Sequence, residues 1–299
     1  MDLFLVETII SGLMTGVMYS LVAIGFVLIF KASGVFNFAQ GVLALFAGLT
    51  LVGLMENFGF PAWLAILATI AVMIALAWAI EFFILRHLVN QEHIILFMAT
   101  LGLAYILEGA GDLIWGSDVK VLDIGLPQGA SDWLLDSYGL YVEKIEMVAA
   151  VVATVMVIVL TVFLQTTRTG RALRAVADDH QAALSIGISL RTIWVVVWSV
   201  AGIVALVAGV MWGSKSGIQF SLSLIALKAL PVLILGGFTS VPGAIVGGLI
   251  IGVGEKLAEV YLGPFVGGAI ENWFAYMLAL GFLLIRPQGL FGEKIIERV

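Results

Sequence analysis

Apolar residues fill long, nearly uninterrupted stretches of this chain, and short polar segments separate them. A transmembrane helix needs about 20 mainly apolar residues. The pattern therefore predicts an all-α polytopic membrane protein with about 8–10 transmembrane helices. Two runs, 38–55 and 221–238, are short and are candidates for broken or re-entrant segments. The nine candidate spans are residues 5–30, 38–55, 62–86, 93–114, 145–164, 192–212, 221–238, 242–260 and 266–285.

Composition supports the same class. The 299 residues are 62% hydrophobic and 11% charged, with a mean hydropathy of +1.15. Soluble domains are about 45–50% apolar and about 25% charged, so the solvent of this chain must be lipid. The net charge of −6, with no basic domain, argues against nucleic acid as a partner. Cysteine is absent, which excludes disulfides and thiolate chemistry.

Charged residues in the loops orient the spans. The segment 165–191 carries four arginines, whereas the segment 115–144 carries five acidic residues against two lysines. Short basic loops stay in the cytoplasm, so we expect 165–191 to be cytoplasmic and 115–144 to be extracytoplasmic. Counting spans outward from these loops places the N-terminus outside and the C-terminus in the cytoplasm.

The basic segment has its own helix signals. Asp178 or Asp179 can cap a helix that starts near His180, and Gly187 stands where a helix C-cap glycine belongs. A second helical piece precedes it at 171–177, with an apolar stripe on one face and a charged stripe on the other. Its apolar residues are Leu173, Val176 and Ala177, and its charged residues include Arg171 and Arg174. Such a helix-turn-helix either lies on anionic headgroups or docks into a groove of another protein. The small surface of Ala182 and Ala183 before the glycine turn favours docking into a protein groove.

Catalytic motifs are missing from the sequence. The Gly213–Gly217 segment, Gly-Ser-Lys-Ser-Gly, lacks the spacing of a phosphate-binding loop. The three histidines form no metalloprotease motif. We therefore expect no catalytic residue, no metal site and no ATPase site in this chain, which argues against an enzyme.

Ionisable residues inside the apolar runs are costly in lipid and usually face protein or water. Lys228 lies too deep in its span to reach the interface easily, so it should pair with Glu108 or Glu255, or meet a substrate carboxylate. We favour structural pairing among these alternatives. Pro231, followed by Gly236-Gly237, should break its helix and free backbone groups to line a cavity.

Several motifs resemble one family of transport proteins. The motif Gln181-Ala182-Ala183-x-x-x-Gly187 resembles the Glu-Ala-Ala-x-x-x-Gly coupling signature of bacterial ABC-importer permeases, with Gln for Glu. The residues Thr169–Asp179 around it resemble the permeases of the branched-chain amino acid importers, and the similarity runs nearly end to end. The chain is most similar to the smaller, H-type permease subunit. The other matching blocks are Tyr19–Gly25, Asn37–Gly41, Leu235–Ala244 with Glu255, and Arg286–Gly292.

The resemblance implies a single transmembrane permease domain over residues 1–299, in a bacterial or archaeal cytoplasmic membrane. It implies a second permease subunit (an M-type paralogue or a copy of this chain), two separate ABC ATPase subunits and an extracytoplasmic solute-binding protein. It implies contact with membrane lipid, no cofactor, and ATP bound only by the partner subunits. The ATPase-coupling residues would be Arg168, Gly170, Arg171, Arg174, Asp178, Asp179, Gln181, Ala182, Ala183 and Gly187. The translocation-pathway residues would be Asn37, Gln40, Glu108, Lys228, Pro231, Gly236, Gly237, Ser240, Pro242 and Glu255.

One departure from the family leaves the solute open. Gln40-Gly41-Val42 stands where the family often has His-Gly-Glu. A branched-chain amino acid is the solute that the resemblance implies, and urea, a short amide or an aromatic acid remains an alternative. Two other functions also stay open, namely a secondary transporter or channel that needs no ATPase, and a membrane scaffold without transport.

Overall fold

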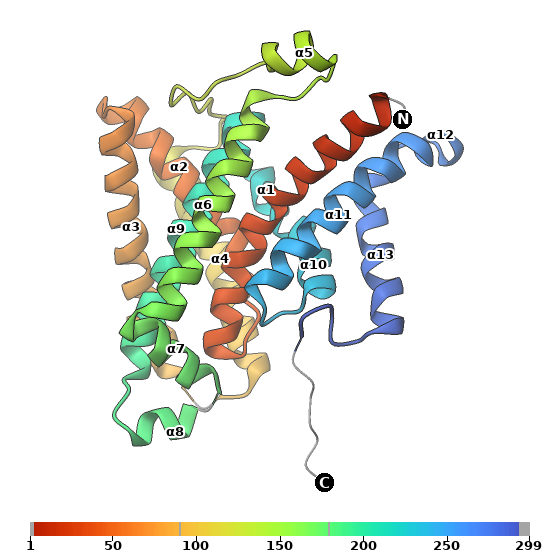
Figure 1. Ribbon diagram of the computed structural model, residues 1–299. Coiled ribbons are helices and arrows are strands. Elements are labelled where there is room, and N and C mark those ends of the chain that lie inside the picture. The colour runs from red at the N-terminus through yellow and green to blue at the C-terminus, as the bar shows by residue number, and fades with distance from the viewer. Residues whose placement is uncertain (1–2, 90, 179, 293–299) are drawn as a thin grey trace. The chain divides into compact units, whose positions relative to one another are not determined.

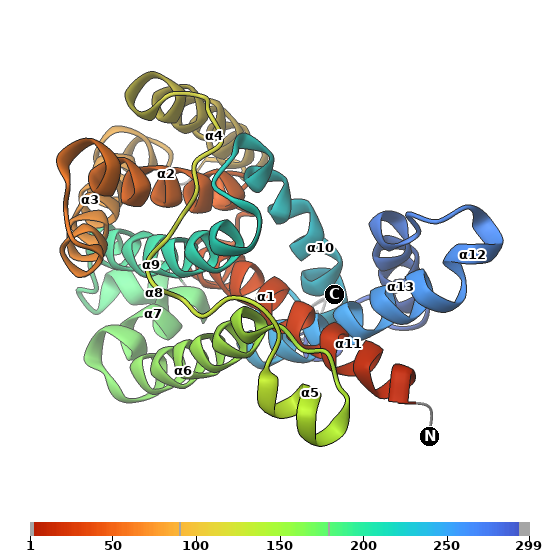
Figure 2. The same ribbon diagram turned by 90° about the horizontal axis from the view of Figure 1, so that it is seen from above.

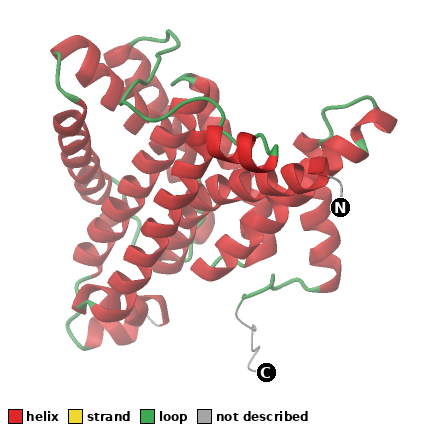
Figure 3. Cartoon of the chain, turned by 45° about the horizontal axis from the view of Figure 1, so that its top comes forward, coloured by secondary structure: helices red, strands yellow, loops and turns green. Residues whose placement is uncertain are grey.

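The computed structural model describes residues 3–89, 91–178 and 180–292, and the regular secondary structure in these ranges is helical (Figures 1 and 3). The all-α class expected from the sequence is confirmed. The helices are α1 (Leu3–Ser33), α2 (Gln40–Phe58), α3 (Ala62–Phe83), η1 (Leu85–His87), α4 (His93–Trp115), α5 (Asp132–Tyr138), α6 (Lys144–Thr166), α7 (Arg168–Asp178), α8 (His180–Ser185), α9 (Leu190–Ser216), η2 (Phe220–Leu224), α10 (Ile225–Gly236), α11 (Val241–Tyr261), α12 (Gly263–Val266) and α13 (Glu271–Ile285).

Seven helices among the described residues are long and apolar enough to cross a membrane. They are α1, α2, α3 with η1, α4, α6, α9 and α11. The remaining two expected spans are shorter apolar helices, Phe220–Gly236 and Trp273–Ile285. The run at 38–55, which its length marked as a candidate broken segment, forms the full 19-residue helix α2. The run at 221–238 is interrupted, because it changes from 3₁₀ to α geometry after Leu224 and contains Pro231.

The chain forms two compact units, and the chain passes between them inside helices α1, α6 and α10 and also between Ile124 and Gly125. Unit 1 comprises Met1–Val27, Gly125–Thr154 and Leu227–Val299, and unit 2 comprises Leu28–Ile124 and Val155–Ala226.

In unit 2, helix α2 is the central element. It packs against α3, α4 and α9, and α9 also packs along α3 (Figure 2). Every residue of α2 from Gln40 to Gly53 is buried, which a helix achieves only when other helices surround it. Gly209 of α9 lies against the backbone of Ala44, so the two helices approach closely at this point.

In unit 1, α1 and α11 cross through small residues. Gly16 of α1 lies against Gly248 of α11, and a Cβ added to Gly248 would sit 2.6 Å from the Gly16 carbonyl oxygen. The crossing is held by Ser20, whose hydroxyl lies 2.9 Å from the Gly16 carbonyl oxygen and 3.2 Å from the Ala244 carbonyl oxygen. Small residues at four-residue spacing allow such close packing in lipid, where no hydrophobic force draws helices together. Helix α13 packs against α11 in the same unit.

Candidate functional site

The basic segment of unit 2 folds into two short helices, α7 and α8, as its sequence predicts. In α7 the side chains of Leu173 and Val176 are buried, whereas those of Arg171 and Arg174 are exposed. The predicted apolar and charged stripes are therefore confirmed. Arg168 is the first residue of the helix.

The start of α7 is fixed against the end of α6. The Thr167 hydroxyl accepts a hydrogen bond from the Gly170 backbone N–H at 2.9 Å, which satisfies one of the free donors at the helix start. Gly170 must lack a side chain, because a Cβ there would run into the backbone of Phe163 and Leu164. The Arg171 guanidinium also donates to the Thr166 carbonyl at 3.1 Å.

Helix α8 ends at the predicted glycine. Gly187 has φ +84°, a left-handed conformation that favours glycine. Its backbone N–H donates to Leu184 O at 3.0 Å, and the Ile188 N–H donates to Ala183 O at 3.0 Å, so the last turn closes on itself. Helix α9 then begins at Leu190, three residues after the glycine.

Exposure within this turn differs from the sequence expectation in one respect. Ala182 is exposed, but Ala183 is buried at 2% and packs inside unit 2. The expected exposed surface of two alanines is therefore wrong for Ala183. The outward apolar surface is made instead by Leu184 and Ile186, which are 49% and 74% exposed. We call Ala182, Leu184 and Ile186 the α8 apolar surface.

The remaining predicted coupling residues fall at the junction of these helices. Asp178 is the last residue of α7, and Gln181 lies in the first turn of α8. Asp179 lies outside the described residues. A coupling role for any of these residues stays a prediction.

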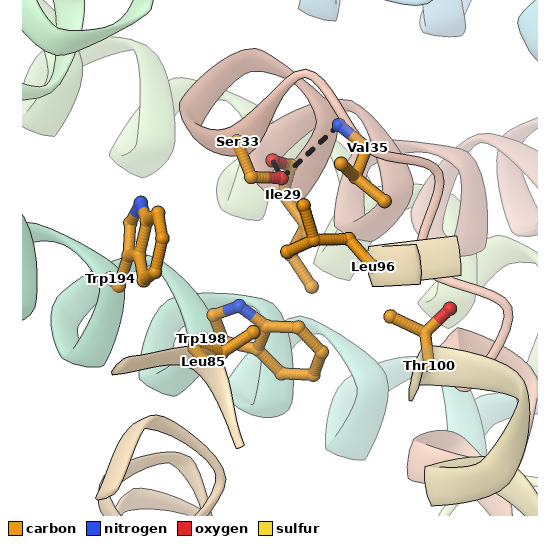
Figure 4. A pocket seen from close by; sticks show the side chains of 8 residues that line it. All are labelled: Ile29, Ser33, Val35, Leu85, Leu96, Thr100, Trp194 and Trp198. Carbon is orange, nitrogen blue, oxygen red and sulfur yellow. Dashed lines mark hydrogen bonds between the residues drawn. The ribbon is translucent and has the colours of Figure 1, made fainter. Parts of the chain in front are cut away.

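A small, mostly apolar pocket lies at the start of α9 in unit 2 (Figure 4). Trp194 and Trp198 of α9 form one wall, and the end of α1, η1 and the start of α4 supply the others. The Trp194 indole N–H is buried and has no hydrogen-bond partner there. Sequence reasoning missed this pocket, since its walls come from four separate segments. The lining residues are Ile29, Ser33, Val35, Leu85, Leu96, Thr100, Trp194 and Trp198.

The two predicted pathway amides of unit 2, Asn37 and Gln40, are buried and bonded within the protein. The Asn37 carboxamide oxygen accepts from the Ala39 N–H at 3.1 Å, and its nitrogen donates to the Gln40 side chain at 3.4 Å. Gln40 in turn donates to the Ala201 carbonyl of α9 at 3.4 Å. These bonds tie the α1–α2 connection to α9. Glu108 lies half-buried on α4.

The predicted charges of unit 1 form a network. The Lys228 ammonium of α10 lies 2.6 Å from Oε1 of Glu255 on α11. Of the partners that the sequence left open for Lys228, the structure shows Glu255. Tyr19 of α1 donates its hydroxyl to the same Oε1 at 3.1 Å, and Lys228 also donates to the Glu271 carbonyl at 3.3 Å. Sequence reasoning missed Tyr19, although a tyrosine hydroxyl buried in an apolar span requires a polar partner.

Backbone carbonyls at the end of α10 are hydrogen-bonded by another part of the same chain. The carbonyls of Leu235 and Gly236 accept hydrogen bonds from Leu290 and Phe291 at 2.8 and 3.1 Å. Gly237 has φ +101° and packs against the backbone at Gly292. The expectation that this break frees backbone groups to line a cavity is therefore wrong for these two carbonyls, because the chain near the C-terminus occupies them.

The remaining pathway residues, Pro231, Ser240 and Pro242, have evident local roles. Pro231 is buried inside α10 and removes one backbone donor from the helix. The Ser240 hydroxyl caps α11 by accepting from the Gly243 N–H at 3.0 Å, and Pro242 occupies its first turn. The predicted pathway set is thus divided, with Asn37, Gln40 and Glu108 in unit 2 and the other seven residues in unit 1.

Comparison with known proteins gives consistent relatives over almost the whole chain. Residues 8–286 match the family described as the branched-chain amino acid transport system permease component. The chain is 27% identical over 311 residues to the high-affinity branched-chain amino acid transport system permease protein LivH of Escherichia coli (strain K12), covering 99% of this chain and 98% of that protein. It is 29% identical over 304 residues to BraD, the permease protein of the same description in Pseudomonas aeruginosa, covering 98% and 97%.

An archaeal relative and a solved structure also match. The probable branched-chain amino acid transport permease protein LivH of Methanocaldococcus jannaschii is 28% identical over 281 residues, covering 91% of this chain and 88% of that protein. A chain of PsaBC from Streptococcus pneumoniae, solved in complex with Fab, is 15% identical with a TM-score of 0.49, covering 92% of this chain and 89% of that chain.

Proposed function

This chain belongs to the family of branched-chain amino acid transport system permease components, and on that premise we propose how its two candidate sites work in transport. The chain is a multi-pass membrane permease of the ABC-importer type and a transport component. We propose that it acts as one transmembrane domain in a bacterial or archaeal cytoplasmic membrane. Its second permease subunit would be an M-type paralogue or a copy of this chain.

The α7–α8 segment is the proposed docking site for an ATPase subunit. The observation that supports this most directly is the α8 apolar surface, because Leu184 and Ile186 expose large apolar side chains in a segment that also carries four arginines. Short helices with one apolar face bind by laying that face into a groove of a partner. In this proposal two ATPase subunits bind ATP, and this chain binds none.

The link from α8 to α9 gives the docking site a mechanical role. Only the turn at Gly187 and two further residues separate α8 from Leu190, the start of α9. A displacement of α8 therefore reaches α9 without passing through a long flexible loop. The first turns of α9 carry Trp194 and Trp198, so the pocket at their base would change shape when α9 moves.

The orientation follows from the loop charges. Basic loops stay in the cytoplasm, so the segment 165–191 faces the ATPases and the C-terminus lies on the same side. The N-terminus and the acidic segment 115–144 would then lie outside, where an extracytoplasmic binding protein delivers the solute.

The proposed solute is a branched-chain amino acid or a related small polar molecule. The relatives that match almost the full chain bear names for branched-chain amino acid transport. The partly buried ion pair Lys228–Glu255 supplies both a cation and an anion in unit 1, which suits a solute that carries both charges.

Reconstitution tests this function. The chain would be purified with its partner permease, ATPases and binding protein, placed in liposomes, and assayed for uptake of labelled L-leucine. We expect uptake only when ATP is present on the ATPase side. Uptake that proceeds without ATPase subunits and follows a proton gradient would identify a secondary transporter instead.

A further inference from the structure

Four helices of unit 1 bring polar groups together around one carboxylate. Tyr19 comes from α1, Lys228 from α10, Glu255 from α11 and Glu271 from the start of α13. Both hydrogen bonds to Glu255, from the Lys228 ammonium at 2.6 Å and from the Tyr19 hydroxyl at 3.1 Å, reach the same oxygen, Oε1. The carboxylate is therefore held from one side only.

The other oxygen of this carboxylate is unused. Glu255 is 2% exposed, and its Oε2 is buried without a hydrogen-bond partner. A carboxylate has about four acceptor positions, and leaving one oxygen buried and unsatisfied costs free energy that a ligand can recover. Glu255 thus presents one acceptor atom for a positively charged or hydrogen-bond-donating group.

Lys228 presents the complementary group. An ammonium has three N–H donors, and two of them are directed at Glu255 Oε1 and at the Glu271 carbonyl oxygen. One donor remains, and the lysine side chain is 24% exposed. The pair therefore has one unused donor, on Lys228, and one unused acceptor, Oε2 of Glu255.

A zwitterionic amino acid complements this pair. Its ammonium donates hydrogen bonds, its carboxylate accepts them, and the two groups are separated by a single carbon atom. Binding such a solute to a neutral ion pair adds no net charge to a low-dielectric site, which avoids the cost of burying an isolated ion. A urea or simple amide carries neither full charge, and a simple carboxylic acid would add an unbalanced negative charge. The geometry and the charge balance thus favour a zwitterion over those alternatives.

We propose that the Lys228–Glu255 pair is a solute subsite, in which Lys228 binds the carboxylate and Glu255 Oε2 binds the ammonium of a zwitterionic amino acid. This rests on the proposed transport function. The solute uses the N–H donor of Lys228 and the oxygen of Glu255 that the pair leaves unused, so the 2.6 Å ion pair and the Tyr19 hydrogen bond to Oε1 stay in place.

The test uses the full importer complex in lipid nanodiscs without the binding protein, so that the permease itself is probed. Equilibrium binding of labelled L-leucine is measured in competition with L-leucinamide, which lacks the carboxylate, and 4-methylpentanoate, which lacks the ammonium. For Lys228→Gln we expect leucine affinity to fall roughly 10- to 150-fold, the value of a hydrogen bond to a charged group, while leucinamide affinity changes little. Glu255→Gln should weaken leucine and leave 4-methylpentanoate unchanged.

A matched control lies one position from Glu255. Lys256 also forms an ion pair, at 3.5 Å with Glu271, and its side chain is 34% exposed. Lys256→Gln removes the same charge from an ion pair of the same unit and should leave leucine affinity within twofold of the wild type. An equal loss of affinity in the Lys256 and Lys228 variants would indicate a general charge effect and overturn the subsite.

A charge-swapped double variant separates a solute subsite from a purely structural pair. Lys228→Glu combined with Glu255→Lys restores an ion pair, so thermal stability should return toward the wild type. Leucine affinity should stay reduced, because the charges then face the solute in reverse. If the swap restores both stability and leucine affinity, the pair is structural and the proposal is wrong.

Failure of the subsite and failure of the transport function give different results. ATP-driven leucine uptake that is unchanged in Lys228→Gln and Glu255→Gln would overturn the subsite and leave the importer function standing. ATP-driven uptake restricted to urea or a short amide would do the same. Leucine uptake by the wild type that needs no ATPase would overturn the transport function itself.

Discussion

Ile186 provides the sharpest test of the proposed ATPase docking site. Its side chain is 74% exposed in the turn after α8, where it packs against little of its own chain. Ile186→Ser removes an apolar side chain and should leave the fold intact, because surface substitutions away from special features change stability by about 0.5 kcal/mol or less.

The expected loss of ATPase affinity follows from how much of the Ile186 side chain docking would bury. Covering an exposed Ile side chain completely contributes about 1.5–3 kcal/mol. With 74% of the side chain available, a groove that covers it gains roughly 1.1–2.2 kcal/mol. Loss of that contact raises the dissociation constant of the ATPase by roughly 6- to 40-fold, since each 1.4 kcal/mol is a factor of ten.

The assay measures binding of the labelled partner ATPase to the permease in nanodiscs, together with solute-stimulated ATP hydrolysis. Val121→Ser is the matched control, because Val121 is 76% exposed and lies in the segment expected on the opposite side of the membrane. The control should bind the ATPase like the wild type. Wild-type ATPase affinity in Ile186→Ser, or an equal loss in both variants, would refute the docking role of the α8 apolar surface.

Three further predictions concern stability, each measured by thermal unfolding in the same lipid. Gly248→Leu should lower stability by roughly 3 kcal/mol, the upper range for overpacking, because a Cβ at this position meets the backbone of α1. The control is Gly281→Ala, at a helical site with open space, which should raise stability by up to about 1 kcal/mol. An equal response of the two variants would contradict the close crossing of α1 and α11. Gly187→Ala should cost roughly 1–2 kcal/mol, since φ is +84°, and Gly187→Asn should cost less; no difference from wild type would show that the turn relaxes. Arg86→Gln should cost about 3 kcal/mol by leaving the buried Glu81 carboxylate without its cation at 3.0 Å, and Glu81→Gln in the same background should recover part of that loss.

The local features of the molecule were predictable, because their causes are local. The helix stop at Gly187 depends only on a left-handed turn that glycine adopts easily, and the amphipathic stripe of α7 depends only on helical spacing. The apolar runs predicted the spans for the same reason. Pro231 similarly lies within a candidate span, 221–238, that is interrupted in the structure.

The features that depend on distant contacts were not predictable. The sequence does not distinguish Ala183, which is buried, from its neighbour Ala182, which is exposed, because both residues fit a surface of small side chains. The choice of Glu255 over Glu108 as the partner of Lys228 depends on how α10 packs against α11. Occupation of the Leu235 carbonyl likewise depends on the path that the chain takes after α13.

The two candidate sites lie in different units, yet the chain joins the units inside helices. The crossing in α6 falls between Thr154 and Val155, and α6 is followed after one residue by α7. The crossing in α10 falls between Ala226 and Leu227, directly before Lys228. Helices transmit displacement along their axes better than loops do, because each backbone hydrogen bond links residues four apart. A shift of α7 would therefore be passed to α6, which continues into unit 1, and Lys228 stands two residues after the point where α10 leaves unit 2. If the α7–α8 segment docks the ATPase as proposed, ATP binding should therefore change the affinity of the Lys228–Glu255 subsite for leucine.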